Sequence, residues 1–281
     1  MGHSYQDRLL RVIDYIHDNL DGDLSLDTLA DIACMSRFHW HRVFRGMTGE
    51  TVAQAVRRIR LHKASMDLIA TDEPIPAIAE RFGYPNVASF TRAFATAYGL
   101  PPGAFRERGE ARRLELLKRS GDGTMFPVKT ETYPELTLAA VPHKGHYDEI
   151  SVAFEQAIGI FTSRNLLSHW AGLAGVYGDD PDIVAPEDLR SYAGVILADP
   201  ASFPMDIEGL ELLKIPAGKF AVMEHKGPYA TLREAYGWFF GTWLPESGEE
   251  VGDQPCVEVY LNDPRETAPE DLRTDVRMAV A

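Results

Sequence analysis

The sequence predicts two domains: an all-α domain with two helix-turn-helix motifs, then an α+β domain built from two pseudo-symmetric strand-helix repeats. The chain has 281 residues, and a domain with a single hydrophobic core is usually shorter than this. Apolar residues follow a helical spacing in the first half and alternate in the second. Each half also repeats itself at a constant offset. We place the first domain at residues 1–118, a linker at 119–125 and the second domain at 126–281.

Composition limits the classes of protein that fit. An apolar content of 45% excludes a mainly disordered chain, and no run reaches the roughly 18 apolar residues of a membrane span. The first residues include Asp7, Arg8 and Arg11, so this segment does not have the pattern of a secretory signal. Only Cys34 and Cys256 are present, so we expect neither a disulfide framework nor a zinc site. We predict a cytoplasmic protein with no membrane segment, metal or cofactor.

Charge is distributed unequally between the two halves. Residues 1–119 hold 17 Lys and Arg against 15 Asp and Glu, a net of +2, whereas residues 120–281 hold 11 against 27, a net of −16. Between residues 34 and 64 only Glu50 opposes a run of basic residues: Arg37, Arg42, Arg45, Arg57, Arg58, Arg60 and Lys63. Because a basic patch attracts phosphate, the first domain can bind nucleic acid although the whole chain is acidic.

The first domain contains one helix-turn-helix pattern twice, at residues 29–44 and 78–94, after a helix predicted from the apolar spacing of residues 9–20. Paired positions lie 49 residues apart before the turn and 50 apart after it. The turns fall at Cys34 and Gly83. Ser36 and Asn86 then stand where a helix N-cap belongs, because their side chains can accept backbone N–H bonds. This repetition is typical of a DNA-binding domain.

A connecting helix is predicted between the two copies, over residues 51–70. A helix of this length spans about 30 Å, and one turn of B-DNA spans about 34 Å. The connecting helix can therefore hold two recognition helices in successive major grooves.

The recognition helices supply the predicted DNA contacts. Candidates for base edges are Arg37, Phe38, His41 and Arg42 in the first helix, and Val87, Ala88, Ser89 and Arg92 in the second. Arg45 and Arg60 complete the predicted DNA-binding set from the basic patch. The alternative is that Arg42 and Arg92 only brace packed helices and that Phe38 belongs to the core.

The region from about residue 7 to 108 resembles the AraC/XylS-type DNA-binding domain. The matching stretches are SLDTLADIACMSRFHWHRVFRGMTG, RRIRLHKA and IPAIAERFGYPNVASFTRAFATAYGLPPGAFR. The resemblance implies a transcription regulator that reads two adjacent major-groove segments with one monomer. Val56 stands where the family often has a tyrosine. Phe38 stands where some members place a DNA-contacting tryptophan, so the base code is not carried over.

The second domain repeats itself at an offset of 82 residues: HKGHY at 143–147 matches HKGPY at 225–229. Each copy is predicted to run from a strand through a turn into an aromatic-rich helix, with strands at 128–132, 136–141, 220–224 and 257–261. Gly145 and Gly227 suit turn conformations, and we place the His-Lys pairs on exposed strand ends rather than at a metal. We expect the helices on one sheet face and a ligand cleft on the other.

The strand at residues 255–261 carries the candidate ligand site. Alternation puts Val257, Val259 and Leu261 on one face, which should pack on the helices, and Glu258 with Tyr260 on the other, beside the cleft. Other aromatic residues of this half complete the predicted ligand-binding set: Tyr147, Trp170, Tyr177, Tyr192, Tyr229 and Trp238. A carboxylate among aromatic rings suits an organic cation. A solvated sheet face is the alternative for Glu258.

Residues from about 126 to 280 resemble the GyrI-like effector-binding domain of multidrug-sensing regulators. The matching stretches are GVYGDDPDIVAPEDLRSYAGV, IPAGKFAVMEHKGPY and PCVEVYLNDP. The resemblance implies that Glu258 faces a ligand pocket. Met278 and Ala279 depart from the isoleucine-proline ending that is common in the family.

Together these observations predict a transcription regulator that binds double-stranded DNA and is controlled by a small lipophilic or cationic effector. RNA polymerase is a further candidate partner. We expect no enzymatic activity. Two alternatives stay open: a hydrolase that uses Glu258 as a general acid or base, and a second domain that binds a protein instead of a ligand.

Overall fold

The computed structural model describes residues 4–109, 125–204 and 206–281. The chain divides into two compact units, Met1–Ser120 and Gly121–Ala281. The predicted linker at 119–125 lies outside the described residues except for Met125, so its bounds stay a prediction. Each unit is described by itself.

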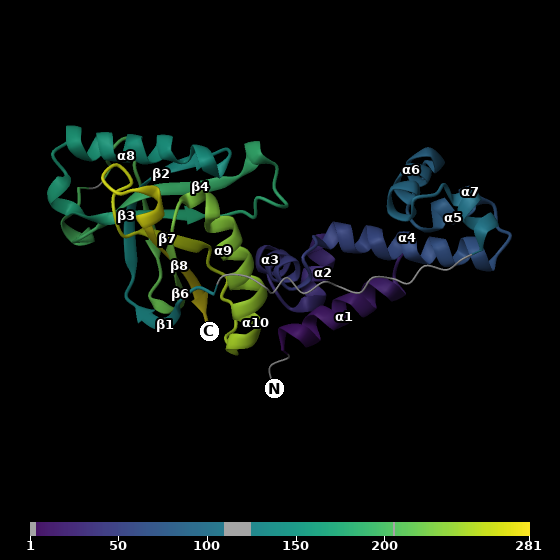
Figure 1. Cartoon of the computed structure of the whole chain (residues 1–281). Helices are drawn as coiled ribbons and strands as arrows, with labels where there is room; N and C mark the ends of the chain where they lie inside the picture. Colours follow the sequence, from purple (N-terminus) through teal and green to yellow (C-terminus); the bar gives the residue numbers. More distant parts are fainter. Residues whose placement is uncertain (1–3, 110–124, 205) are drawn as a thin grey trace. The chain divides into compact units, whose positions relative to one another are not determined.

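In the described residues of the first unit, the regular secondary structure is helical (Figure 1). Its helices are α1 (Tyr5–Asp18), α2 (Leu26–Ala33), α3 (Arg37–Thr48), α4 (Val52–Ala70), α5 (Ile75–Arg81), α6 (Val87–Tyr98) and α7 (Pro102–Arg108). One hydrophobic cluster joins them, and Trp40, Phe44, Phe90 and Phe94 are fully buried in it. The two recognition helices therefore rest on a shared core.

Local signals in the sequence set the helix boundaries of both motifs. The Ser36 side chain accepts a hydrogen bond from the His39 backbone N–H, and the Asn86 side chain accepts from that of Ala88, as predicted for N-caps. The two turns use left-handed backbone, with φ of 54° at Cys34 and 80° at Gly83. The predicted connecting helix corresponds to α4, which lies between the motifs in sequence.

The second unit is an antiparallel eight-stranded sheet with helices. In spatial order its strands are β1 (Val128–Tyr133), β6 (Gly218–Lys226), β8 (Arg273–Val280), β7 (Cys256–Tyr260), β3 (Trp170–Tyr177), β4 (Arg190–Leu197), β2 (Leu136–Lys144) and β5 (Glu211–Ile215). Its helices are α8 (Ser151–Ser163), α9 (Leu232–Trp238) and α10 (Leu244–Ser247), with a π-helical segment, Phe239–Trp243, between α9 and α10.

The strand order confirms the predicted internal repeat. It reads the same from both edges once β1 is matched with β5, β6 with β2, β8 with β4 and β7 with β3. A pseudo-two-fold axis therefore passes between β3 and β7. The edge strands are exchanged, because β1 pairs with β6 and β5 pairs with β2. Each half thus completes the sheet of the other half.

The two HKG turns follow the same repeat. Gly145 and Gly227 have φ of 140° and 137°, and their N–H groups donate to the carbonyls of Leu189 and Leu272. The preceding Lys144 and Lys226 are exposed, and each pairs with an aspartate at 2.8 Å. The prediction of exposed His-Lys pairs is wrong for His225, which is 1% exposed. Its strand position points the imidazole into the unit.

The predicted assignment of the two sheet faces is wrong. Val257 and Val259 belong to a cluster formed by sheet residues alone, whereas α8 packs on β2 and β4 over the opposite face (Figure 1). Tyr177, on the same face as Glu258, clusters with Ala153 of α8. Glu258 therefore lies on the helix side of the sheet. The valine face needs no helix, because side chains of the edge strands, such as Tyr133 and Leu213, cover it.

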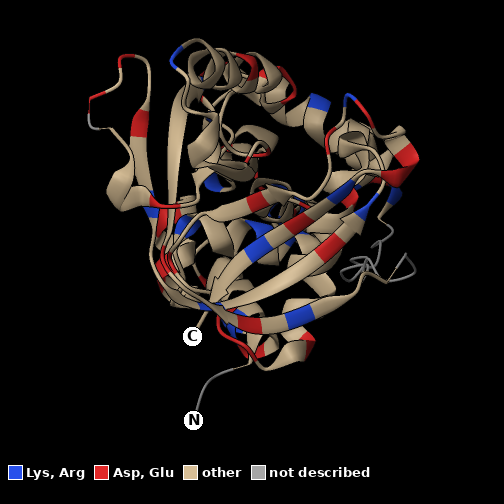
Figure 2. Ribbon diagram, turned by 90° about the vertical axis from the view of Figure 1, so that its left-hand side faces the viewer, with Lys and Arg blue, Asp and Glu red and all other residues tan. Residues whose placement is uncertain are grey.

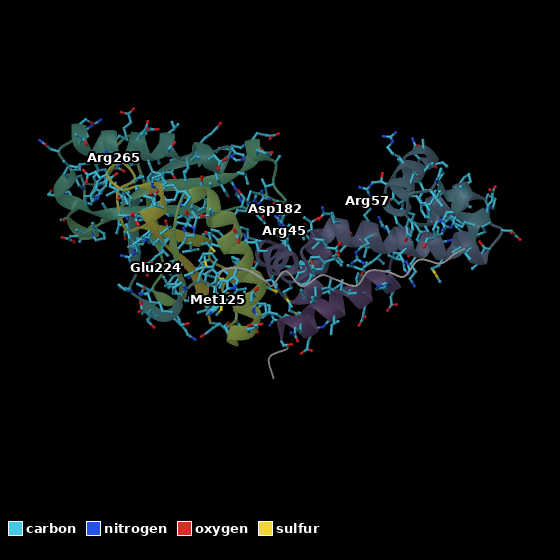
Figure 3. All side chains as sticks on the ribbon, viewed as in Figure 1. Arg45, Arg57, Met125, Asp182, Glu224 and Arg265 are labelled. Atoms are coloured by element: carbon cyan, nitrogen blue, oxygen red, sulfur yellow. The ribbon has the colours of Figure 1, made fainter. Side chains whose placement is uncertain are left out.

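The sheet face that carries Val257 and Val259 also carries charged residues on β6 and β8. Figure 2 shows acidic and basic positions close together on the strands. Glu224 on β6, labelled in Figure 3, accepts from Arg273 on the adjacent β8 at 2.8 Å. The guanidinium of Arg277 lies 4.2 Å from the ring centroid of Tyr133. Cross-strand pairs of opposite charge stabilise a sheet modestly.

Candidate functional site

The second recognition helix, α6, presents its predicted residues to solvent. Val87, Ala88, Ser89 and Arg92 are all exposed, and Phe90 between them is buried in the core. The residues follow directly after the N-cap at Asn86, so they occupy the first turns of the helix. This is the part of a recognition helix that reaches base edges.

The first recognition helix, α3, is less uniform. Arg37 is exposed and lies 3.6 Å from Asp27, and the guanidinium of Arg42 stacks 4.4 Å from the ring centroid of Phe38. His41 is only 4% exposed, so the structure does not favour the base contact predicted for it. Sequence periodicity did not separate His41 from Phe38 and Arg42, which are partly exposed.

The two further arginines of the predicted set differ in their surroundings. Arg45 lies in the last turn of α3. Arg60 on α4 donates through Nε to the carbonyl of Leu20 at 3.1 Å, and its guanidinium lies against Gly83 in the second turn. Arg60 thus braces the fold. Arg57, also on α4 and labelled in Figure 3, is exposed; the sequence analysis placed it in the basic patch but not among the DNA contacts.

Glu258 on β7 is the centre of the second candidate site. Its side chain is buried, at 5% exposed. The Tyr236 hydroxyl donates to its Oε1 at 3.0 Å, and the Tyr260 hydroxyl donates to its Oε2 at 3.0 Å. The hydroxyls of Tyr260 and Tyr177 are 2.8 Å apart, so Tyr177 donates to Tyr260. A chain of hydroxyl donors ends on the carboxylate.

These two tyrosines stay protonated at neutral pH. Burial raises the pKa of Tyr177 and of Tyr260 well above the usual 10, and the negative charge of Glu258 raises both further. The hydroxyls therefore serve as hydrogen-bond donors. Donors of this kind stabilise the ionised form of a buried carboxylate.

Other aromatic rings surround the hydroxyl chain. The rings of Phe154 on α8 and Tyr229 each lie 5.4 Å from that of Tyr260, and the ring of Tyr147 lies 4.9 Å from that of Tyr177. The hydroxyl of Tyr147 donates to the carbonyl of Asp179 at 2.9 Å, which fixes the ring. We call Glu258, Tyr147, Phe154, Tyr177, Tyr229, Tyr236 and Tyr260 the Glu258 cluster.

Five of the eight predicted ligand residues come together in this cluster, and three do not. Trp170 packs against Phe161 of α8, 5.9 Å between centroids. Tyr192 lies on the other sheet face, opposite Val176. The ring of Trp238 lies 5.5 Å from that of Phe126. The sequence identified these residues as aromatic but contained no information about the direction in which each side chain points.

Tyr236 and Phe154 were missed as site residues, although the sequence contained a signal for them. They occupy equivalent positions of the two repeats, 82 residues apart, and Tyr147 and Tyr229 are related in the same way. Because the pseudo-axis passes through the site, equivalent residues face it from both sides. Aromatic residues at equivalent positions of the two repeats were therefore candidates for the site.

Two further features of the described residues concern groups of metal-ligating side chains and long apolar helices. Among them, no group of three or more His, Cys, Asp or Glu side chains is placed to hold a metal ion. Within the same residues, no helix is long and apolar enough to span a membrane.

Comparison with known proteins gives two family matches. Residues 126–281 match the family model of the GyrI-like small molecule binding domain, and residues 29–108 match that of a helix-turn-helix domain. The multiple antibiotic resistance protein MarA of Escherichia coli is 32% identical over 109 residues, which cover 38% of this chain and 86% of MarA. An uncharacterized HTH-type transcriptional regulator of Bacillus subtilis, YbfP, is 33% identical over 102 residues, 36% of this chain and 35% of YbfP.

Among solved structures, a hydrolase from Listeria innocua aligns with a TM-score of 0.38 and 16% sequence identity. The alignment covers 55% of this chain and 91% of the hydrolase. A likeness at this level is too low to carry an activity to this chain.

Proposed function

We propose that the effector of this protein is a lipophilic cation that binds at the Glu258 cluster. The chain belongs to the GyrI-like small-molecule-binding family through residues 126–281 and to the AraC-type helix-turn-helix regulators through its first half. As a member of both families it is an effector-controlled, DNA-binding transcription regulator. The nature of the effector and the residues that hold it are the proposal.

One observation carries the proposal: a buried carboxylate, hydrogen-bonded by two tyrosine hydroxyls, sits within a shell of aromatic rings. In such a low-dielectric environment a cation is attracted more strongly than in water. The aromatic faces add cation–π attraction and apolar contact area. A neutral ligand of the same shape would gain only the contact area.

We test the proposal with Glu258→Gln, which keeps the shape of the side chain and removes its charge. Affinity for tetraphenylphosphonium, measured by calorimetry, should fall by more than about 1.4 kcal/mol, or tenfold, because the ion pair is lost. Affinity for neutral triphenylphosphine oxide should change little. The matched control is Glu224→Gln, which removes an exposed carboxylate on the other sheet face. Equal losses for the cation and the neutral compound would make Glu258 a structural residue.

We also propose that the protein is not an enzyme. Tyr177 and Tyr260 hold their protons at neutral pH, which suits donation to Glu258 and not attack on a substrate. Turnover of an ester or epoxide probe that disappears in Glu258→Gln would contradict this.

A regulator bound to DNA acts where the DNA is, so we propose a cytoplasmic location. RNA polymerase remains a proposed partner.

For DNA, we propose base contacts by the exposed start of α6 and by Arg37, Phe38 and Arg42 of α3. Arg45 and the exposed Arg57 are proposed as phosphate contacts. α4 has 19 residues, a length of about 28 Å, which supports reading of two adjacent grooves by one unit.

A further inference from the structure

The two repeats differ in one informative way at the centre of the Glu258 cluster. Gly175 on β3 and Glu258 on β7 are direct register partners. They are also 83 residues apart, the same offset that relates Tyr177 to Tyr260. The pseudo-two-fold axis therefore passes between Gly175 and Glu258. One half places a carboxylate at the axis, and the other half places no side chain there.

Backbone conformation does not explain this glycine. Gly175 lies inside the regular pairing of β3 with β4 and β7, and its φ is not in the left-handed region that favours glycine. Any residue could adopt this backbone. The reason for glycine must be the space above it.

That space is filled by the hydroxyl chain. A Cβ added at Gly175 would lie 3.0 Å from Cε2 of Tyr177 and 3.1 Å from each of the hydroxyls of Tyr177 and Tyr260. At contacts this short the neighbouring side chain must give way by a few tenths of an ångström. The neighbours are the same hydroxyls that pass hydrogen bonds to Oε2 of Glu258.

We propose that Gly175 is a positioning residue that determines the effector site's preference for cations: its missing side chain lets the hydroxyls of Tyr177 and Tyr260 reach the axis and orient the Glu258 carboxylate. A methyl group at this position would require the hydroxyls of Tyr177 and Tyr260 to move by a few tenths of an ångström and would disturb the hydrogen bond from Tyr260 to Oε2 of Glu258. This inference rests on the proposed cation site and adds the residue that shapes it.

The test compares Gly175→Ala with Gly172→Ala in the full chain, by calorimetry with tetraphenylphosphonium and triphenylphosphine oxide. Gly172 is on the same strand, and a Cβ there would meet only Ile196 at an ordinary 3.4 Å. Gly175→Ala should weaken cation binding at least tenfold and lower the ratio of cation to neutral affinity. Gly172→Ala should bind both probes like the wild type.

A double-mutant cycle with Tyr260→Phe separates the mechanism from general damage. If Gly175→Ala acts by displacing the Tyr260 hydroxyl, the substitution should have little further effect once that hydroxyl is absent. The affinity of the double variant for the cation should then lie within about twofold of that of the weaker single variant. Additive losses, or a Gly175→Ala variant with unchanged cation preference, would overturn the inference. Failure of the underlying function is distinguishable, because the wild type would then bind tetraphenylphosphonium no better than Glu258→Gln does.

Discussion

At the scale of single residues, two buried polar side chains of the second unit, Glu258 and His225, have contrasting surroundings. A buried charge is costly unless hydrogen bonds replace its water. The Tyr236 and Tyr260 hydroxyls supply such bonds to Glu258. Hydrogen bonds to a carboxylate favour its ionised form in an apolar environment. His225 is the contrasting case, because burial there favours the neutral form.

His225 should make the second unit less stable in acid. Burial lowers the pKa of His225 below its usual 6.5. As the pH falls through that usual value, the unfolded chain binds a proton that the folded chain resists, so the free energy of unfolding decreases. Above it both states are neutral and the effect is absent.

We expect urea midpoints to be lower at about pH 5.5 than at about pH 7.5, with a smaller difference in His225→Gln. Glutamine can keep the hydrogen bond to Thr231, which His225 makes at 2.8 Å. His146→Gln, which removes an exposed histidine of the same unit, serves as the matched control. An unchanged pH difference in His225→Gln would assign the acid sensitivity to other groups.

At the scale of elements, the two equivalent helices of the repeat are built differently. α8 is a regular α-helix of 13 residues, whereas α9 has 7 residues and continues into the π-helical segment at 239–243. Such segments often occur at functional sites. α9 carries Tyr236, which bonds Glu258, and Trp238, which contacts Phe126 near the start of the described part of this unit. It thus links the proposed ligand site to the end of the unit that leads toward the DNA-binding half of the chain.

Trp238→Ala should therefore uncouple ligand binding from DNA binding. We expect nearly unchanged affinity for tetraphenylphosphonium, since the Trp238 side chain is outside the Glu258 cluster. The ratio of DNA affinities with and without the probe, measured by fluorescence anisotropy, should move toward one. Val152→Ala, on the exposed face of α8, serves as the control. A normal DNA response in Trp238→Ala would mean that α9 does not carry the coupling.

At the scale of the whole molecule, the two units have different charges and different partners. The first half has a net charge of +2 and the second half −16. The acidic half should repel DNA, which leaves phosphate contact to the basic residues of the first unit. Salt screens this repulsion between the acidic half and DNA.

DNA binding by the full chain should weaken steeply as salt rises, because phosphate contacts release counterions. Arg57→Ala should lower the salt slope by about one and weaken all sequences alike, whereas Arg92→Ala should cost about 1–3 kcal/mol and relax specificity at one base position. Titrations at several salt concentrations with a panel of duplexes measure both. If Arg92→Ala weakened every duplex equally, Arg92 would be a phosphate contact.

Features that depend on residues close together along the chain could be predicted from the sequence alone. Ser36 and Asn86 cap their helices because their side chains reach the backbone two or three positions ahead. The duplicated motifs and the HKG turns follow from spacing along the chain, and the two families follow from the resemblance of the matching stretches. Glu258 was found because alternation along its strand and a family resemblance both pointed to it.

Only the tertiary structure decided which side of the sheet the helices cover and which aromatic rings meet. Alternation separates Val257 from Glu258 but does not say which of them faces a helix. The exchanged edge strands close the valine face, and this long-range pairing is not encoded in any local pattern. Tyr236 reaches Glu258 and Tyr192 does not, because their directions depend on where whole elements pack.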